Sequence, residues 1–178
     1  MGRRLFLWES AGFLFTAVLG VLLHDTYGWS GQRAAVAAFA SVNESTWEHM
    51  KLLFVPLFLF SVVQMCVLGR NYPNFLWSRA LAVMTGLLLI PIFFYTYTGI
   101  LGRHITWVNI AIFFLAAAGT FWLDYRLLRR GRHGTLWRQL VGLTVLWALA
   151  FAFVWCTFRP PHVALWQDPA TGQYGRAE

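Results

Sequence analysis

The chain has 178 residues, of which 58% are hydrophobic, 18% aromatic and only 12% charged, and its mean hydropathy is +0.56. Soluble domains use about a quarter of their residues as Asp, Glu, Lys and Arg, so the composition excludes a water-soluble globular fold. The 16 Phe and 10 Trp residues exclude disorder, and 2 cysteines are too few for a disulfide scaffold. An integral membrane protein remains.

A helix needs about 20 mostly apolar residues to cross a hydrocarbon core of about 30 Å. Five stretches meet this requirement: residues 5–23, 44–68, 77–101, 105–128 and 136–158. We therefore predict an all-α fold in which residues 1–158 form a bundle of about five transmembrane helices. Residues 159–178 form a turn-rich tail, which we expect to fold back over the mouth of the bundle.

The basic residues predict the orientation of this bundle, because Lys and Arg near the ends of spans favour the cytoplasmic side. With the N-terminus inside, nine basic residues are cytoplasmic, namely Arg3, Arg4, Arg70, Arg79, Arg126, Arg129, Arg130, Arg132 and Arg138. Five lie on the other side, namely Arg33, Lys51, Arg103, Arg159 and Arg176. We predict a cytoplasmic N-terminus and a C-terminus outside.

The net charge of +7 comes largely from the Arg-rich connection at residues 126–138. Because this connection lies on the predicted cytoplasmic side, we expect it to contact anionic membrane lipids, and we do not expect nucleic acid as a partner. A homo-oligomer or another membrane subunit is a further expected partner, because five spans without an inverted repeat are few for a transporter that works alone.

Most other ionisable groups fall at the predicted outer ends of the spans. These are four of the five histidines and four of the seven acids, namely His24, His49, His104, His162, Asp25, Glu44, Glu48 and Asp168. The predicted topology was set without the histidines and acids, so their position on one side of the membrane is an independent observation. The sequence predicts a polar vestibule open to the outside.

The densest polar stretch, residues 41–51, opens the second span and has two interpretations. Ser41 and Glu44 match a capping box, and Asn43 and Ser45 are alternative helix caps. Glu44, Glu48 and Lys51 lie on one helix face as an ion-pair ladder. However, the chain is continuously apolar after Lys51, so these groups lie at or below the headgroups. Ionisable groups at that depth face the bundle interior or a wet cavity and pair with one another. Both interpretations stay open.

Imidazoles and carboxylates that converge in this way are the ligands of a divalent metal such as zinc. The candidate metal ligands are His24, Asp25, His49, His162 and Asp168. The candidate catalytic residues are Glu44 or Glu48 as the general base and Lys51 to hold an anion. No motif of fixed spacing, such as His-Glu-x-x-His, supports this set.

Two acids lie near the other end of the bundle. We expect Glu9 to pair with Arg3, Arg4 or the basic connection, and Asp124 to form a surface pair with Arg126.

Three separated motifs carry a resemblance to a known family. They are VNESxWEHxKL at residues 42–52, YTYTG at residues 95–99 and PPHxxLxxDPxTGxYG at residues 160–175. Together they resemble an uncharacterised family of small bacterial multi-pass membrane proteins, known only as a domain of unknown function. The resemblance implies a location in the cytoplasmic (inner) membrane of a bacterium and a fold of several spans. It implies no activity.

Two classes of function follow. In the first, the vestibule is a metal-dependent hydrolase site for a lipid or another amphiphile. The cluster is similar in kind to that of the seven-span membrane hydrolases related to alkaline ceramidases. In the second, the protein is a non-enzymatic transporter, a channel-like protein or an accessory subunit. The same residues then form a substrate, proton or structural network.

Overall fold

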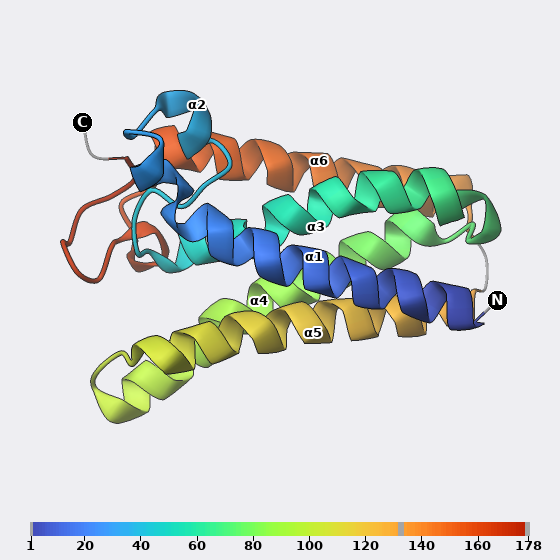
Figure 1. Cartoon of the computed structure of the whole chain (residues 1–178), viewed down its shortest axis with the longest axis horizontal. Coiled ribbons are helices and arrows are strands. Elements are labelled where there is room, and N and C mark those ends of the chain that lie inside the picture. The colour runs from blue at the N-terminus through green and yellow to red at the C-terminus, as the bar shows by residue number, and fades with distance from the viewer. Residues whose placement is uncertain (1, 132–133, 177–178) are drawn as a thin grey trace.

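The computed structural model describes residues 2–131 and 134–176 (Figure 1). Its five long helices are α1 (Gly2–Trp29), α3 (Thr46–Leu68), α4 (Phe75–Leu101), α5 (Thr106–Arg130) and α6 (Leu136–Phe158). Each is long and apolar enough to cross a bilayer, which confirms the predicted all-α bundle of five spans. Three short helices connect or follow them: α2 (Ala34–Ala37), η1 (Gly69–Asn71) and η2 (Ala164–Trp166).

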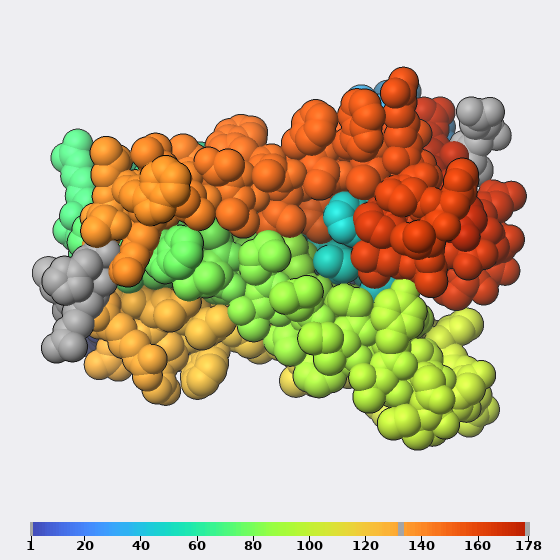
Figure 2. All heavy atoms as spheres, turned by 180° about the vertical axis from the view of Figure 1, so that it is seen from behind, coloured from blue at the N-terminus to red at the C-terminus, as the bar shows by residue number. Residues whose placement is uncertain are grey.

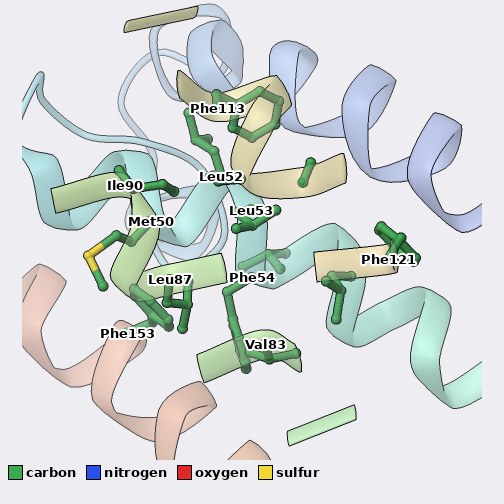
Figure 3. Close-up of a cluster of buried hydrophobic side chains, with 14 of the residues drawn as sticks. Met50, Leu52, Leu53, Phe54, Val83, Leu87, Ile90, Phe113, Phe121 and Phe153 are labelled. Carbon is green, nitrogen blue, oxygen red and sulfur yellow. The ribbon is translucent and has the colours of Figure 1, made fainter. Parts of the chain in front are cut away.

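Helix α3 lies at the centre of the bundle, where it packs against α1, α4 and α6, while α5 packs against α1 and α4 (Figure 1). The core is apolar and rich in phenylalanine. Figure 3 shows Phe54 of α3, Leu87 of α4, Phe113 of α5 and Phe153 of α6 meeting there. Since α3 contributes to contacts on several sides, it is the most buried of the five long helices.

The bundle has two different ends. One end carries the start of α1, the end of α5 and the start of α6, and we call it the arginine-rich end after Arg3, Arg130 and Arg138. The opposite end carries the end of α1, the start of α3 and the tail, and we call it the vestibule end. At the vestibule end the tip of the α4–α5 hairpin projects away from the tail (Figure 2). That the arginine-rich end faces the cytoplasm stays a prediction.

Glycine allows α1 to approach α3 closely near the vestibule end. A Cβ atom placed on Gly20 would lie 2.5 Å from Cζ of Phe113 and 2.9 Å from the backbone oxygen of Leu52. No larger residue fits there without moving backbone. One turn further along α1 stands His24, so this contact sets how near its imidazole comes to α3.

Two acids of the arginine-rich half, Glu9 and Asp124, are buried and have partners other than those expected from the sequence. Asp124 is 0% exposed and lies 2.8 Å from Nη2 of Arg79, so the expected pair with Arg126 is wrong. Glu9 is 4% exposed and accepts a hydrogen bond from Gln64 rather than from an arginine near the N-terminus. Each acid finds its partner on another helix, and sequence neighbours do not reveal such a partner.

Candidate functional site

Ser45 begins helix α3 and thereby positions the polar residues of its first turn. Its backbone is extended, with φ −67° and ψ 152°, and its Oγ accepts a hydrogen bond of 3.4 Å from the backbone N–H of Glu48. The helix cap is therefore Ser45, which the sequence offers as an alternative to Ser41 of the capping box. Ser41 instead donates to the backbone oxygen of Asn43 and shapes the preceding loop.

Three candidate residues meet at the vestibule end. His24 comes from the last turns of α1, Glu44 from the loop before α3, and His49 from the first turns of α3. Nε2 of His24 lies 3.4 Å from Oε1 of Glu44, and Nε2 of His49 lies 3.6 Å from Oε2 of Glu44. One ligand atom of each residue lies within 4.8 Å of the other two. Helix α1 extends past residue 23 to Trp29, so His24 and Asp25 stand on a helix rather than in a loop.

Both imidazoles are held through Nδ1, which leaves Nε2 facing Glu44. Nδ1 of His49 lies 2.9 Å from the backbone oxygen of Ser45, and Nδ1 of His24 lies 3.2 Å from Oδ1 of Asp25. A carbonyl or carboxylate oxygen only accepts, so Nδ1 of each ring carries a hydrogen. Nε2 of His24 carries a second hydrogen while it donates to Glu44, and it would give up that hydrogen to bind a metal. Metal-binding histidines are usually oriented by this kind of hydrogen bond.

The charge on Glu44 is stabilised by its surroundings. Its hydrogen bond with His24 holds the pKa of the Glu44 carboxyl below its ordinary value, against the opposing effect of partial burial. The nearby charges of His49 and His104 act in the same direction. Glu44 is therefore a carboxylate at neutral pH and is ready to bind a cation.

A cavity of about 800 Å³ opens beside this cluster. Polar groups line one part of it, namely His24, Asp25, Glu44, Thr46, His49, His104, Thr106 and Asn109. Apolar side chains line the rest, namely Val21, Leu52, Ile90, Phe94, Ile110, Ile112, Phe113 and Phe114. Pro169 and Ala170 of the tail also contribute to the lining. The cavity is amphipathic, with the His–Glu cluster at its polar part.

Sequence reasoning placed His104 at the same end as the other histidines but did not include it in the site. It lies in the α4–α5 connection and lines the cavity with Asn109, to which Tyr97 donates a hydrogen bond. The signal available in the sequence was the position of His104 just before α5, on the predicted outer side. Because His104 is far from the other motifs along the chain, the sequence offered no reason to include it in the candidate site.

Glu48 and Lys51 form a separate, fully buried pair. Nζ of Lys51 lies 2.5 Å from Oε2 of Glu48 and also donates to Ala37 of α2 and Thr157 of α6. Oε2 of Glu48 also accepts from the backbone N–H of Val42. Neither residue belongs to the cavity lining. Their interactions connect α2, α3 and α6 rather than face a ligand.

The tail contacts the bundle, but the side chains of His162 and Asp168 bond within the tail itself. The His162 ring packs edge-on against Tyr174, and Asp168 accepts from Ala170 and Thr171 in a turn. The structure therefore does not bring either residue to the His–Glu cluster.

Other residues make the contacts that hold the tail in place. The Trp166 ring lies 4.7 Å from the Trp47 ring, and Asn43 donates to the backbone oxygen of Gly175. The backbone N–H of Arg176 donates to the backbone oxygen of Thr157. The tail thus contacts both the loop that carries Glu44 and the end of α6.

Five apolar helices around a phenylalanine-rich core define a multi-pass membrane protein. The chain belongs to the family of unknown function DUF6512, whose model matches residues 4–176. No curated protein and no solved structure matches it. The uncharacterised family indicated by the sequence is thus confirmed, whereas the particular motifs and a bacterial origin stay predictions.

Proposed function

We propose that this protein is a metal-dependent hydrolase of a lipid or another amphiphile. We place it in the cytoplasmic membrane of a bacterium, with its vestibule end facing outside. The observation that carries the proposal is the His24–Glu44–His49 cluster, in which both imidazoles present Nε2 to one carboxylate beside a large amphipathic cavity.

The spacing of the cluster suits a divalent ion such as zinc. Two ligand atoms bound to a tetrahedral zinc ion at about 2.0–2.2 Å lie about 3.3–3.5 Å apart. The two His–Glu separations, 3.4 Å to Oε1 and 3.6 Å to Oε2 of Glu44, are each close to that spacing. One ligand atom from each of the three residues lies within 4.8 Å of the other two, so the three ligands would draw closer together around an ion. Two histidines and one carboxylate also leave a coordination position for water, as in catalytic zinc sites. A divalent ion at such a position supplies a hydroxide near neutral pH and polarises a carbonyl or phosphoryl oxygen.

The shape of the cavity supports an amphiphile as the substrate. Its apolar lining comes from α1, α3, α4 and α5, and its polar lining holds the ligand cluster. Val21 of α1 and Ile110 of α5 line the cavity and are 51% and 52% exposed. An apolar chain can therefore enter from the lipid while its polar group meets the histidines.

The remaining polar residues have distinct proposed roles. Asp25 orients His24 and raises the basicity of its ring. His104 is the candidate general acid that protonates the leaving group, because it lines the cavity without belonging to the three-residue cluster. Glu44 acts as a ligand rather than as the general base. Glu48 and Lys51 act structurally, since neither reaches the cavity.

The test is metal content by elemental analysis of detergent-purified protein, comparing wild type with His24→Ala, Glu44→Ala and His49→Ala. The matched control is His162→Ala, which removes an imidazole at the same end of the bundle but outside the cluster. We expect about one ion per chain in wild type and in the control, and loss of the ion in the other three. Cobalt substitution gives a second readout, because its visible absorption reports the ligand set without requiring activity.

Hydrolysis is then tested with chromogenic esters of increasing acyl length, with and without chelator. Longer chains are expected to react faster, because more of the apolar lining is filled. A protein that holds no ion, or whose ion survives all three substitutions, overturns the proposal. The cluster is then an ion-pair network, and the non-enzymatic transporter or accessory role becomes the one to pursue by reconstitution.

A further inference from the structure

A second cluster of ionisable groups lies in the arginine-rich half of the bundle, away from the vestibule. It joins four helices through Glu9 of α1, Gln64 of α3, Arg79 of α4 and Asp124 of α5. Glu9 is 4% exposed and the other three are 0% exposed. The proposed hydrolase uses none of these residues, so their presence in a membrane core requires another explanation.

The guanidinium of Arg79 is the centre of the cluster. Its Nη2 lies 2.8 Å from Oδ2 of Asp124, 3.6 Å from Oε1 of Glu9 and 2.5 Å from Oε1 of Gln64. Gln64 in turn donates through Nε2 to Oε1 of Glu9 at 2.6 Å. The rings of Phe75 and Phe121 lie against the same guanidinium, and Arg79 is 0% exposed.

The charges in this cluster do not balance. Two carboxyl groups lie beside one guanidinium, and within residues 2–131 and 134–176 no second cation forms an ion pair with either of them. If both were ionised, one uncompensated negative charge would remain in a dry interior, which is strongly unfavourable. By contrast, Glu48 is matched one to one by Lys51 at the other end of the bundle.

We propose that Glu9 and Asp124 together bind one proton, which makes the cluster electrically neutral and creates a proton-binding site in the arginine-rich half of the membrane. One carboxylate pairs with Arg79, and the other carboxyl group is neutral. The proton belongs to the pair rather than to one residue, as for other carboxyl groups that face a shared partner. Within the described part of the chain, Oε2 of Glu9 and Oδ1 of Asp124 have no hydrogen-bond partner, so positions for the proton exist.

Other titratable groups lie toward the aqueous end of the cluster. The phenol of Tyr72, just beyond η1, lies within electrostatic range of both Glu9 and Arg4. We expect a proton to reach the pair from the side on which Tyr72 and Arg4 lie. Loss of the proton leaves a net negative charge between α1, α3, α4 and α5, so deprotonation loosens their packing at this end. The proton site thereby couples pH on the arginine-rich side to the stability of the bundle.

The test is infrared difference spectroscopy of the full chain in detergent, recorded in H₂O and D₂O near neutral pH. Wild type is expected to show the C=O stretching band of a buried protonated carboxylic acid, shifted in D₂O. Glu9→Gln and Asp124→Asn are each expected to abolish this band, because the single remaining carboxylate is then matched by Arg79. Glu48→Gln is the matched control for removal of a buried acid, and it should keep the band.

Thermal unfolding gives a second readout. The melting temperature of wild type is expected to fall as the pH is raised through the point at which the infrared band disappears, and Glu9→Gln should lack that fall. Absence of the band in wild type overturns the proposal even if no variant folds. Persistence of the band in both variants also overturns it, as does stabilisation by sodium without any band, because a metal cation then supplies the missing charge.

Discussion

His49 donates from Nδ1 to the backbone oxygen of Ser45, the residue whose side chain caps the helix on which His49 stands. The cap and the orientation of the imidazole therefore depend on one residue. We therefore expect a change that shifts the start of α3 to turn Nε2 of His49 away from Glu44 as well. The local rules that begin a helix thus also organise the candidate metal site.

Replacing Asp25 tests whether His24 is oriented as a ligand. In Asp25→Asn the Nδ1 hydrogen loses a charged acceptor, and we expect zinc affinity to fall about 10- to 100-fold while the ion remains detectable. Competition with a coloured chelator measures the affinity. Asp168→Asn is the control, because that carboxylate closes a turn within the tail. Equal losses in both variants would contradict the assigned role of Asp25.

Gly20 tests the close approach of α1 and α3. Its added Cβ in Gly20→Ala meets the backbone oxygen of Leu52 at 2.9 Å, so we expect a loss of about 1–3 kcal/mol in unfolding free energy and weaker metal binding. Gly28→Ala lies on the same helix with no atom within 4 Å, and it should not destabilise the protein. Unfolding in mixed micelles compares the two. A Gly20→Ala protein as stable as wild type would show that α1 can move aside.

The buried Glu48–Lys51 pair predicts an asymmetric response to substitution. Lys51→Met leaves the Glu48 carboxylate buried without its cation, and we expect destabilisation by about 3–5 kcal/mol. The double variant Glu48→Leu with Lys51→Met should recover most of that loss and retain the metal. The same unfolding assay checks both. A double variant that folds but loses the ion would place this pair in the site after all.

The tail contacts predict that the end of the chain stabilises the bundle. Truncation after Phe158 should lower the melting temperature, and Trp166→Ala should reproduce part of the loss by removing the ring that packs on Trp47, worth about 0.5–1.5 kcal/mol beyond its buried area. His162→Ala should have a smaller effect, since its ring contacts only the tail residue Tyr174 among the aromatic side chains described. An unchanged melting temperature on truncation would contradict this prediction.

The predicted orientation is tested with reporters joined to the C-terminus. Alkaline phosphatase is active only outside the cytoplasm. Green fluorescent protein is not fluorescent outside the cytoplasm when it is exported through the general secretory route. We expect an active phosphatase fusion and a dark fluorescent fusion in a bacterial host, because nine of the basic residues then remain inside. The reverse pattern would place the vestibule in the cytoplasm.

The sequence predicted the spans well because a bilayer imposes length and hydropathy on every crossing helix. The sequence also predicted that His24, Glu44 and His49 lie at one end of the bundle, because the order of the spans alone determines at which end a residue lies. It did not predict how far around each helix a side chain points. His49 and Glu48 are adjacent in sequence, yet one faces α1 and the cavity while the other faces Lys51 and α6.

The same limitation explains the buried acids. Asp124 has Arg126 nearby in sequence, but its partner Arg79 lies on α4, and only the packing of α4 against α5 brings them together. Likewise, motif spacing gave no means of separating His162 and Asp168 from the cluster. Asp168 bonds to Thr171 and the His162 ring packs against Tyr174, so both side chains stay within the tail.

The three proposed ligands stand on different kinds of structural element. The two imidazoles stand on long helices that pack against each other, whereas Glu44 stands on a loop that is held by a hydrogen bond from Asn43 to the end of the tail. Helix packing holds the two imidazoles, whereas hydrogen bonds from Val42 to Glu48 and from Asn43 to Gly175 hold the loop that carries the carboxylate. If the cluster binds an ion, we expect exchange of that ion to require this loop to open. Loosening the tail should therefore shorten the residence time of the metal and leave the geometry of the two histidines intact.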